Sequence, residues 1–324
     1  MMWKLLTLKR LAALWGCIVS ELVSRLIGRP IIWGFPSVIS IEPTAYCNLH
    51  CPECPSGNGD LLRNRGYMDI ALFEKLLNEI ASRSLAIQFF FQGEPFLNSN
   101  LTEMIRQASA AHLYTQVSTN GHFLEENATQ LCQSGLNKLI ISLDGITPET
   151  YTRYRQGGNF DKVKQGIIHL LEEKKKQKTR LPQIELQFIV FEHNEHEIAT
   201  FKHWCKQLNV KSVLKTAQLN KPGKGQVNPP KKSQLSRYTQ HEVNHWSKKS
   251  ITRNACRRLW LNPVICWDGT IAVCCYDKDA LFNIGNINQT SLTNMWKNKA
   301  FQTLRNNILK GNSMPKMCAN CGDH

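Results

Sequence analysis

The sequence predicts an α/β fold with a parallel sheet, and three observations support this. Its 324 residues are enough for one barrel-sized domain and a small appendage. After Pro30, strand-like runs alternate with segments whose apolar residues recur at helical spacing, the pattern of a parallel α/β fold. The chain contains six such strand–helix units, fewer than the eight of a closed barrel. A closed eight-unit barrel is therefore not expected.

The expected elements follow one another in alternation. Strands are expected over residues 38–43, 85–91, 114–118, 138–143, 183–191 and 210–215. Helices are expected over residues 69–82, 101–111, 125–134, 160–176 and 198–207. The active site of such a fold gathers at the carboxyl ends of the strands, so the residues that follow each strand are the candidate site residues.

The chain divides into four segments. The α/β domain covers residues 31–219 and is preceded by an amphipathic helix over residues 1–30. A polar, basic stretch over residues 220–250 has the composition of a linker. Residues 251–324 contain six of the twelve cysteines and are expected to form a small α+β domain.

The N-terminal segment has two interpretations. Its uninterrupted apolar run, Leu11–Val19, is too short to cross a bilayer. Basic residues interleaved with Leu, Trp and Val favour a helix that lies on a membrane surface, with Trp3 and Trp15 at the interface. The other interpretation is a helix packed across the open bottom of the barrel.

Charge and cysteine content bound the partners and the compartment. A net charge of +15 favours an acidic partner, such as a phosphorylated substrate or the anionic inner face of a membrane, or is simply a solvated basic surface. Nucleic acid is not expected, because we find no separate RNA-binding domain. Twelve cysteines in a chain of this length indicate a reducing cytoplasm rather than a disulfide scaffold.

Cys47, Cys51 and Cys54 form a C-x3-C-x2-C motif directly after the first strand. Clustered thiolates favour zinc, copper(I) or an iron–sulfur cluster. A structural zinc site needs a fourth ligand, and His50 is poorly placed because it lies between two of the cysteines. Three cysteines leave one iron of a [4Fe-4S] cluster open to a cofactor. We expect the cluster, with zinc as the alternative.

This motif, in this position, resembles that of the radical S-adenosylmethionine (radical SAM) superfamily. The resemblance implies a partial (β/α)6 TIM-like barrel and an open iron chelated by S-adenosylmethionine. One electron, from a donor such as flavodoxin or ferredoxin, then cleaves S-adenosylmethionine to methionine and a 5′-deoxyadenosyl radical. Glu53 is a departure, because the family usually has an aromatic residue there. No catalytic residue can be assigned.

The resemblance also implies contacts to S-adenosylmethionine after the second, third and fourth strands. These residues are Gly93, Glu94, Pro95, Ser118, Asn120, Ser142, Asp144, Arg153 and Arg155. Glu94 matches the family residue near the methionine ammonium, and one of the two arginines is expected to pair with the carboxylate. Gln92 stands where the family has a first glycine. Phe191 and Asn194, after the fifth strand, are weaker candidates. Each motif is also a turn signal when taken alone.

The C-terminal cysteines resemble those of a SPASM or shorter twitch extension. Asp268-Gly269 between two β-rich runs predicts a hairpin, and residues 292–309 predict a helix. The resemblance implies one auxiliary [4Fe-4S] cluster with four ligands, which are Cys256, Cys274, Cys318 and Cys321. Cys266 and Cys275 remain alternative ligands, and the same spacing permits a zinc site.

We therefore expect a radical SAM enzyme whose substrate is small, phosphorylated or lipid-linked. The auxiliary cluster is expected to accept an electron from the substrate radical or to ligate the substrate. The alternatives are a radical SAM enzyme that modifies peptides or proteins, and a non-catalytic iron–sulfur protein for electron transfer.

Overall fold

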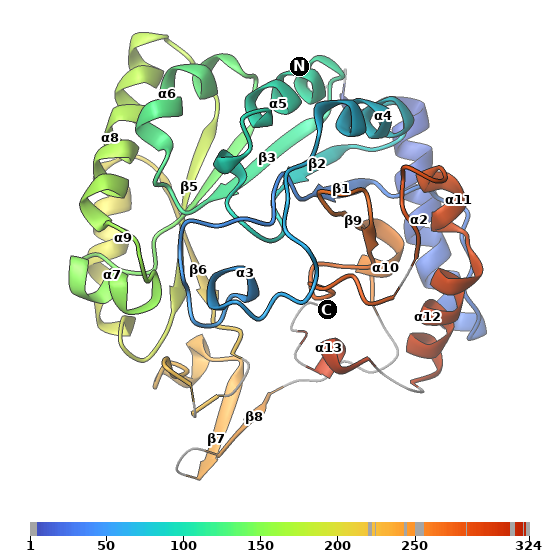
Figure 1. The fold of residues 1–324 in the computed structure, drawn as a ribbon. Helices are drawn as coiled ribbons and strands as arrows, with labels where there is room; N and C mark the ends of the chain where they lie inside the picture. Colours follow the sequence, from blue (N-terminus) through green and yellow to red (C-terminus); the bar gives the residue numbers. More distant parts are fainter. Residues whose placement is uncertain are drawn as a thin grey trace. The chain divides into compact units, whose positions relative to one another are not determined.

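The structure is a computed structural model that describes residues 5–219, 222–223, 225–242, 245–249, 256–282, 284–311, 315–319 and 321. Figure 1 shows its helices and strands along the chain. The chain divides into two compact units. Unit 1 comprises Met1–Tyr46, Leu61–Gln116 and Thr252–His324, and unit 2 comprises Cys47–Asp60 and Val117–Ile251. The chain crosses between the units directly before Cys47, so the whole cysteine loop belongs to unit 2.

In unit 1 the strand order is β10-β9-β1-β2, followed by the first residues of β3. These strands cover Ile271–Ala272, Val264–Ile265, Val38–Ile41, Ala86–Phe89 and Tyr114–Thr119, and the last three residues of β3 belong to unit 2. β1 pairs in parallel with β2, and Val38 lies opposite Ala86. On its other side β1 pairs in parallel with β9, which forms an antiparallel hairpin with β10. The C-terminal hairpin therefore extends the sheet at β1.

In unit 2 the strand order is β4-β5-β6, and these strands cover Lys138–Ser142, Gln183–Val190 and Lys211–Thr216. The β4–β5 and β5–β6 pairs are both parallel. Glu185 on β5 is buried and joins the three strands, since it pairs with Lys138 at 2.8 Å and with Lys211 at 3.1 Å. A small antiparallel pair, β7 (Tyr238–Glu242) and β8 (His245–Lys248), forms a separate sheet.

Helices follow the strands as the sequence predicts. They are α2 (Leu8–Ile27), α3 (Pro55–Asn58), α4 (Ile70–Ile80), α5 (Leu101–Ala110), α6 (Leu124–Gln133), α7 (Pro148–Tyr154), α8 (Phe160–Lys176), α9 (Ile198–Gln207), α10 (Arg258–Leu261), α11 (Leu292–Trp296), α12 (Lys299–Lys310) and α13 (Lys316–Ala319). Short 3₁₀ turns, η1 to η3, cover Pro95–Leu97, Glu195–Glu197 and Ser233–Leu235. The alternation of parallel strands with helices confirms the predicted α/β fold.

The prediction of one helix over residues 292–309 is wrong. The segment forms two helices, α11 and α12, which are separated at Asn298. The Asn298 side chain accepts a hydrogen bond from the Phe301 N–H and donates one to the Ile284 carbonyl. Asparagine at this position therefore caps a new helix instead of continuing the old one.

Helix α2 packs on unit 1 through its polar side. The Arg10 side chain donates hydrogen bonds to the backbone carbonyls of Ala81, Ala111 and His112. Because these carbonyls precede β2 and β3, Arg10 ties the helix to the loops that lead into those strands. Residues 1–4, including Trp3, lie outside the described residues. Among the described helices, none combines the length and hydropathy needed to span a bilayer.

Candidate active site

The cysteine loop folds tightly around Cys51. Cys51 is buried, whereas Cys47 and Cys54 are half-buried. The Cys54 N–H donates to the Cys51 carbonyl at 3.1 Å, and the Cys54 carbonyl then accepts the Gly57 N–H at 2.8 Å as α3 begins. A side chain at Gly57 would lie 2.6 Å from the Cys51 nitrogen, so glycine is needed for this turn. The loop therefore has a defined conformation at all three cysteines.

An apolar wall covers one side of this loop. Leu49 and Cys51 belong to a buried cluster whose other members are Tyr154, Phe191, Ala217, Leu219, Val227 and Tyr238, with Trp246 packed against it. Three of these residues, Val227, Tyr238 and Trp246, come from the stretch over residues 220–250. Its composition is that of a linker, yet in unit 2 this stretch contributes part of the wall beside the cysteines. Burial of this kind lowers the local dielectric around the sulfur atoms.

A buried ion pair lies next to Cys51. Arg155, which ends α7, donates from Nε to Asp144 Oδ2 at 2.8 Å, and its Nη2 lies 2.5 Å from the same oxygen. Its Nη1 lies 4.0 Å from Cys51 Sγ. Asp144 follows β4, is fully buried, and accepts the Ile189 N–H of β5 through its other oxygen. The pair thus joins two strands and a helix end to the cysteine loop.

The charges in this pair depend on each other. Burial raises the pKa of Asp144, while the Arg155 charge and the Ile189 N–H oppose that shift. Burial opposes the charge of Arg155, but the attraction of Asp144 and Cys51 raises the pKa of Arg155 well above its ordinary value. Burial also raises the pKa of the Cys51 thiol, and Arg155 counteracts this. Arg155 is therefore the cation that favours a thiolate at Cys51.

A chain of polar contacts ties the loop to the end of β3. Asn120 Nδ2 donates to Asn48 Oδ1 at 2.8 Å, and Asn120 Oδ1 accepts from the His122 ring at 3.0 Å. The other ring nitrogen of His122 accepts the Asn159 N–H at 2.8 Å, where α8 begins. Burial, together with nearby Lys162 and Arg155, lowers the pKa of His122. A neutral His122 therefore orients Asn120 against the cysteine loop.

Other predicted residues have different surroundings. Ser142 is buried at the end of β4, and Ser118 is half-buried in β3. Arg153 is exposed, so of the two candidate arginines only Arg155 lies at the cysteine loop. Asn194 is fully buried and donates to the carbonyls of Asp144 and Ile189, which is a structural role.

The Gly93-Glu94-Pro95 motif lies in unit 1, against the residues that lead into the cysteine loop. Gly93 has a φ of +75°, and a side chain there would meet the Thr44 carbonyl and lie 2.6 Å from the Tyr46 carbonyl oxygen. The Glu94 N–H donates to that Tyr46 oxygen at 2.8 Å. The glycine is therefore required by close backbone approach, as the motif demands. Glu94 itself is buried and accepts the Phe96 N–H.

The C-terminal cysteines separate into two environments. Burial raises the pKa of Cys256, and the charge of Cys321 adds to this shift. Burial also raises the pKa of Cys274, with additions from Cys275 and Cys256. These thiols therefore lie within electrostatic range of one another. Cys266 differs, because the charges that act on it come from Glu42, Arg63 and acidic residues of the hairpin.

Cys266 instead adjoins a second buried ion pair, which the sequence analysis did not identify. Glu42 follows β1, is fully buried, and accepts two hydrogen bonds from the Arg63 guanidinium. The Trp267 N–H of the C-terminal hairpin donates to Glu42 at 3.2 Å, and Arg63 also donates to the Lys278 carbonyl. Glu42 therefore anchors the hairpin to β1. The only signal in the sequence is a carboxylate directly after a strand.

Among the described residues, no three cysteine, histidine or acidic side chains converge as ligands of one metal ion. Each cysteine that holds a [4Fe-4S] cluster binds a different iron, so the ligands of a cluster do not converge on a single ion. Three thiols in one loop, with a guanidinium beside the buried one, suit such a cluster chemically.

Comparison with known protein families identifies the chain. Residues 41–202 match the radical SAM superfamily, and residues 256–322 match the SPASM family, an iron–sulfur cluster-binding domain. The chain belongs to the radical SAM superfamily. Within it, the chain carries a C-terminal SPASM domain, as predicted. Its cofactors are accordingly the radical SAM [4Fe-4S] cluster, S-adenosylmethionine and a SPASM auxiliary cluster.

Several relatives are GTP cyclases. A GTP 3′,8-cyclase of Lactiplantibacillus plantarum is 27% identical over 176 residues, which cover 53% of this chain and 51% of that protein. A probable GTP 3′,8-cyclase of Methanocaldococcus jannaschii is 25% identical over 224 residues, which cover 67% of this chain and 69% of that protein. The chain spans about half the length of the first of these relatives.

Solved structures share the fold. The Streptococcus suis protein SuiB, bound to S-adenosylmethionine, has a TM-score of 0.64 at 15% identity, covering 87% of this chain and 70% of SuiB. BtrN, in complex with AdoMet and 2-DOIA, has a TM-score of 0.53 at 18% identity, covering 89% of this chain and 94% of BtrN. anSMEcpe, with AdoMet and the Cp18Cys peptide, has a TM-score of 0.59 at 18% identity, covering 89% of this chain and 86% of anSMEcpe. The predicted partial-barrel fold is confirmed.

The ion pair beside Cys51 can be tested through the stability of the protein. Replacing Arg155 by Met leaves Asp144 buried without its cation, so we expect the R155M variant to lose about 3–5 kcal/mol of unfolding free energy. Combining R155M with D144N should recover much of this loss, because the introduced amide is neutral and its carbonyl still accepts the Ile189 N–H. Urea unfolding of the apo protein, followed by circular dichroism, measures both variants.

R153M is the matched control, because Arg153 is exposed on the same helix, and its unfolding free energy should stay within about 0.5 kcal/mol of wild type. Equal losses in R153M and R155M would contradict the role assigned to the buried pair.

Proposed function

We propose that Cys47, Cys51 and Cys54 bind the radical SAM cluster, and that the enzyme uses it to abstract hydrogen from a small phosphorylated or lipid-linked substrate. The main support for this proposal is the position of Arg155. Its Nη1 lies 4.0 Å from Cys51 Sγ, while Asp144 binds the rest of the guanidinium. A cation that is fixed beside a buried cysteine favours the thiolate that a cluster requires.

The residues of unit 2 prepare the loop for its cofactors. When bound together, the cluster and S-adenosylmethionine supply the 5′-deoxyadenosyl radical. Tyr154 and Phe191, whose ring centroids lie 4.5 Å apart, belong to the wall that excludes water from the Cys51 side. Asn120, oriented by His122, holds Asn48 between the first and second cysteines. These contacts keep the loop in one conformation, so that little reorganisation is needed when the cofactors bind.

The proposed SAM contacts divide between backbone and side chains. In unit 1, Gly93 and Glu94 pack tightly against Tyr46. We propose that their backbone groups and the Glu94 carboxylate accept hydrogen bonds from the ammonium group of S-adenosylmethionine. In unit 2, Ser118 and Ser142 are the hydroxyls proposed for the cofactor. Asp144 already pairs with Arg155, so we propose that it holds Arg155 in place and does not contact S-adenosylmethionine directly.

The substrate class is supported by charge and by relatives. A net charge of +15 favours an anionic substrate, and several relatives are named for GTP, a phosphorylated molecule. Peptide modification is the second candidate function, because SuiB and anSMEcpe have been solved with peptides. We place the enzyme in a reducing cytoplasm with flavodoxin or ferredoxin as electron donor, because twelve cysteines in a chain of this length, eight of them at or beside the proposed clusters, suit a reducing compartment.

Cleavage of S-adenosylmethionine tests the proposed function. Anaerobically reconstituted, dithionite-reduced protein should form 5′-deoxyadenosine, and the C47A variant should lose at least about 100-fold of this activity, because it loses a ligand of the cluster. Liquid chromatography with mass detection measures the product, with iron counted in the same samples. C132A is the matched control, since Cys132 is a buried cysteine of α6 whose charged neighbours, Lys174 and Glu173, belong to α8, and it should retain activity.

Three results would contradict this proposal. Protein that binds zinc and no iron under these conditions lacks the proposed cluster. Protein that loads iron but forms 5′-deoxyadenosine equally with and without Cys47 has the cluster ligands elsewhere. Iron loading without any cleavage, in the presence of GTP and of cell-derived small molecules and peptides, favours the non-catalytic iron–sulfur alternative.

The auxiliary cluster is proposed at Cys256, Cys274, Cys318 and Cys321. The C274A variant should lose the iron and sulfide of one of two clusters and keep the other. The C266A variant should keep both, because Cys266 packs beside Ala272 and Phe91 and interacts electrostatically with the Glu42–Arg63 pair. Iron and sulfide analysis, with Mössbauer spectra of both variants, decides between the two cysteines. Loss of a cluster in C266A alone would reverse the assignment.

A further inference from the structure

Helix α2 presents its apolar side to solvent. Leu8, Trp15, Leu22 and Leu26 recur at helical spacing and are 87%, 62%, 54% and 77% exposed. Ala12 and Val19 complete the same face. The buried residues of this helix are mostly polar, namely Arg10, Cys17, Ser20, Glu21 and Ser24. The usual polarity of a surface helix is therefore reversed.

Polar contacts hold the helix in this orientation. Arg10 caps backbone carbonyls of unit 1, and the Ser20 hydroxyl accepts the Trp33 N–H at 2.8 Å. Ser24 similarly accepts the Ile31 N–H at 2.8 Å. Rotating the apolar face inward would break these buried hydrogen bonds, which is costly. A contiguous exposed apolar face held in this way marks an interaction surface.

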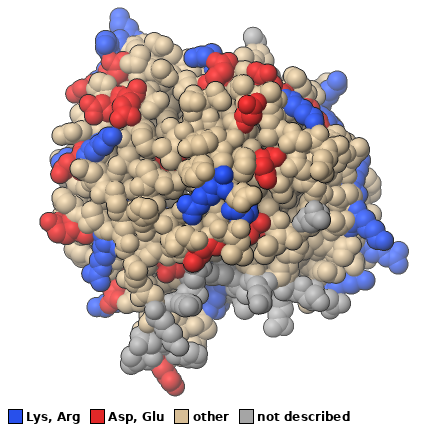
Figure 2. Space-filling view, viewed as in Figure 1, with Lys and Arg blue, Asp and Glu red and all other residues tan. Residues whose placement is uncertain are grey.

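Basic and aromatic residues border the apolar face. At 100° per residue, Lys9 and Arg25 lie on its opposite edges. Trp33, in the segment that follows the helix, is 62% exposed. Lys and Arg side chains also gather along the edge of the molecule where α12 lies (Figure 2). An apolar face with tryptophan and basic borders is the pattern of a helix that lies in the interface of an anionic bilayer.

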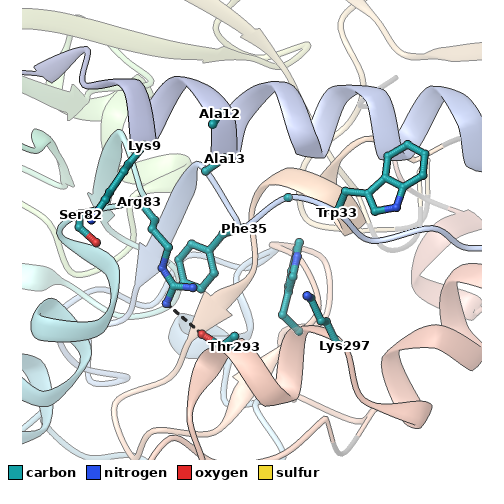
Figure 3. Close-up of a pocket in the computed structure, with 11 residues that line it drawn as sticks. Lys9, Ala12, Ala13, Trp33, Phe35, Ser82, Arg83, Thr293 and Lys297 are labelled. Carbon is teal, nitrogen blue, oxygen red and sulfur yellow. Dashed lines mark hydrogen bonds between the residues drawn. The ribbon is translucent and has the colours of Figure 1, made fainter.

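A cation-lined pocket adjoins this face. The pocket has a volume of about 450 Å³, and three of its lining residues are Lys9, Arg83 and Lys297 (Figure 3). No acidic residue is among the described residues that line it. Trp33 and the exposed Ala12 of α2 also line the pocket, so it opens beside the apolar face.

Arg83 is held in place within the pocket. Its Nη2 donates to Thr293 Oγ1 at 2.9 Å, and its guanidinium stacks on the Phe35 ring at 3.7 Å. Glu79, outside the pocket lining, pairs with Arg83 at 3.7 Å. Within the described part of the chain, neither Lys9 nor Lys297 forms an ion pair with an acidic side chain. Three cationic side chains on one pocket, without an acidic residue among its described lining, suit the binding of a phosphate group.

We propose that the outward face of α2 docks on an anionic phospholipid bilayer, and that this pocket binds a lipid headgroup phosphate. The apolar face enters the boundary between headgroups and acyl chains, with Trp15 and Trp33 at the interface. Charge complementarity selects this partner over a second copy of the chain. Two copies would bring the same cationic pocket into one two-fold interface, and each whole chain carries a net charge of +15, so the copies repel each other.

Flotation of the full-length protein with vesicles tests this proposal. We expect binding to vesicles of equal parts phosphatidylcholine and phosphatidylglycerol, and much weaker binding to vesicles of phosphatidylcholine alone. The double variant L22Q/L26Q should bind on the order of tenfold more weakly or worse, because it removes two apolar side chains from the docking face. L62Q/L281Q is the matched control, since Leu62 and Leu281 are 80% and 71% exposed elsewhere in unit 1.

The pocket has its own matched pair of variants. K297Q removes a lining cation and should weaken binding about fivefold. K299Q removes an exposed lysine two residues after Lys297 that does not line the pocket, so it should weaken vesicle binding less than K297Q does. Inorganic phosphate and glycerol phosphate serve as soluble competitors. We expect these competitors to weaken vesicle binding only partly, because the apolar contact of α2 with the bilayer remains.

Three results would overturn the proposal. Wild-type protein that fails to float with anionic vesicles has no such docking surface. Equal binding by L22Q/L26Q and wild type excludes the α2 face. A dimer in sedimentation analysis that L22Q/L26Q dissociates, without vesicle binding, assigns the face to a second copy. Equal effects of K297Q and K299Q would remove the pocket from the proposal and leave a non-specific attraction.

Discussion

The ion pair between the fully buried Asp144 and the largely buried Arg155 is the interaction on which the arrangement of unit 2 depends. Asp144 has a φ of +58°, which places its carboxylate between the end of β4 and the Ile189 N–H of β5. Arg155 reaches this carboxylate from the end of α7 and extends a third nitrogen toward Cys51. A buried charge without its partner is costly, so each residue requires the other. Together with the Asn120–Asn48 hydrogen bond, this pairing orients the cysteine loop.

Unit 1 uses the same device for a different purpose. Glu42, directly after β1, is fully buried and paired with Arg63, and the Trp267 N–H of the SPASM hairpin completes its hydrogen bonds. β9 then pairs in parallel with β1, so the hairpin becomes part of the sheet. In both units a carboxylate at the end of a strand supports a cysteine-bearing loop. Acidic residues at strand ends are therefore structural here as well as candidates for cofactor binding.

Local patterns in the sequence predicted most of the fold. Helices α8 and α9 cover the residues that periodicity predicts, because their buried apolar residues recur at helical spacing. The break at Asn298 was missed, since apolar spacing continues across it while the cap acts on a single residue. The β7–β8 pair was also missed. Its buried Tyr238 is isolated among polar residues and is held by the distant Leu219 backbone.

The site was predictable to the extent that it is local. The cysteine motif lies within eight consecutive residues, so spacing alone identifies it. Arg153 and Arg155 are equivalent in the sequence, and only the end of α7 decides which one reaches Asp144. His122 was not identified, because its partners Asn120 and Asn159 are brought together by tertiary structure. Contacts between distant residues cannot be read from a single sequence, since they depend on how the strands pair.

Electron paramagnetic resonance tests most directly whether Cys47, Cys51 and Cys54 hold a cluster with an open iron. The C256A/C274A variant, which lacks two of the proposed auxiliary ligands, isolates the first cluster. After reduction it should give the signal of a single [4Fe-4S]⁺ cluster, and the addition of S-adenosylmethionine should change that spectrum because the cofactor binds the open iron. A spectrum that S-adenosylmethionine leaves unchanged, or the absence of any cluster in this variant, would contradict the assignment.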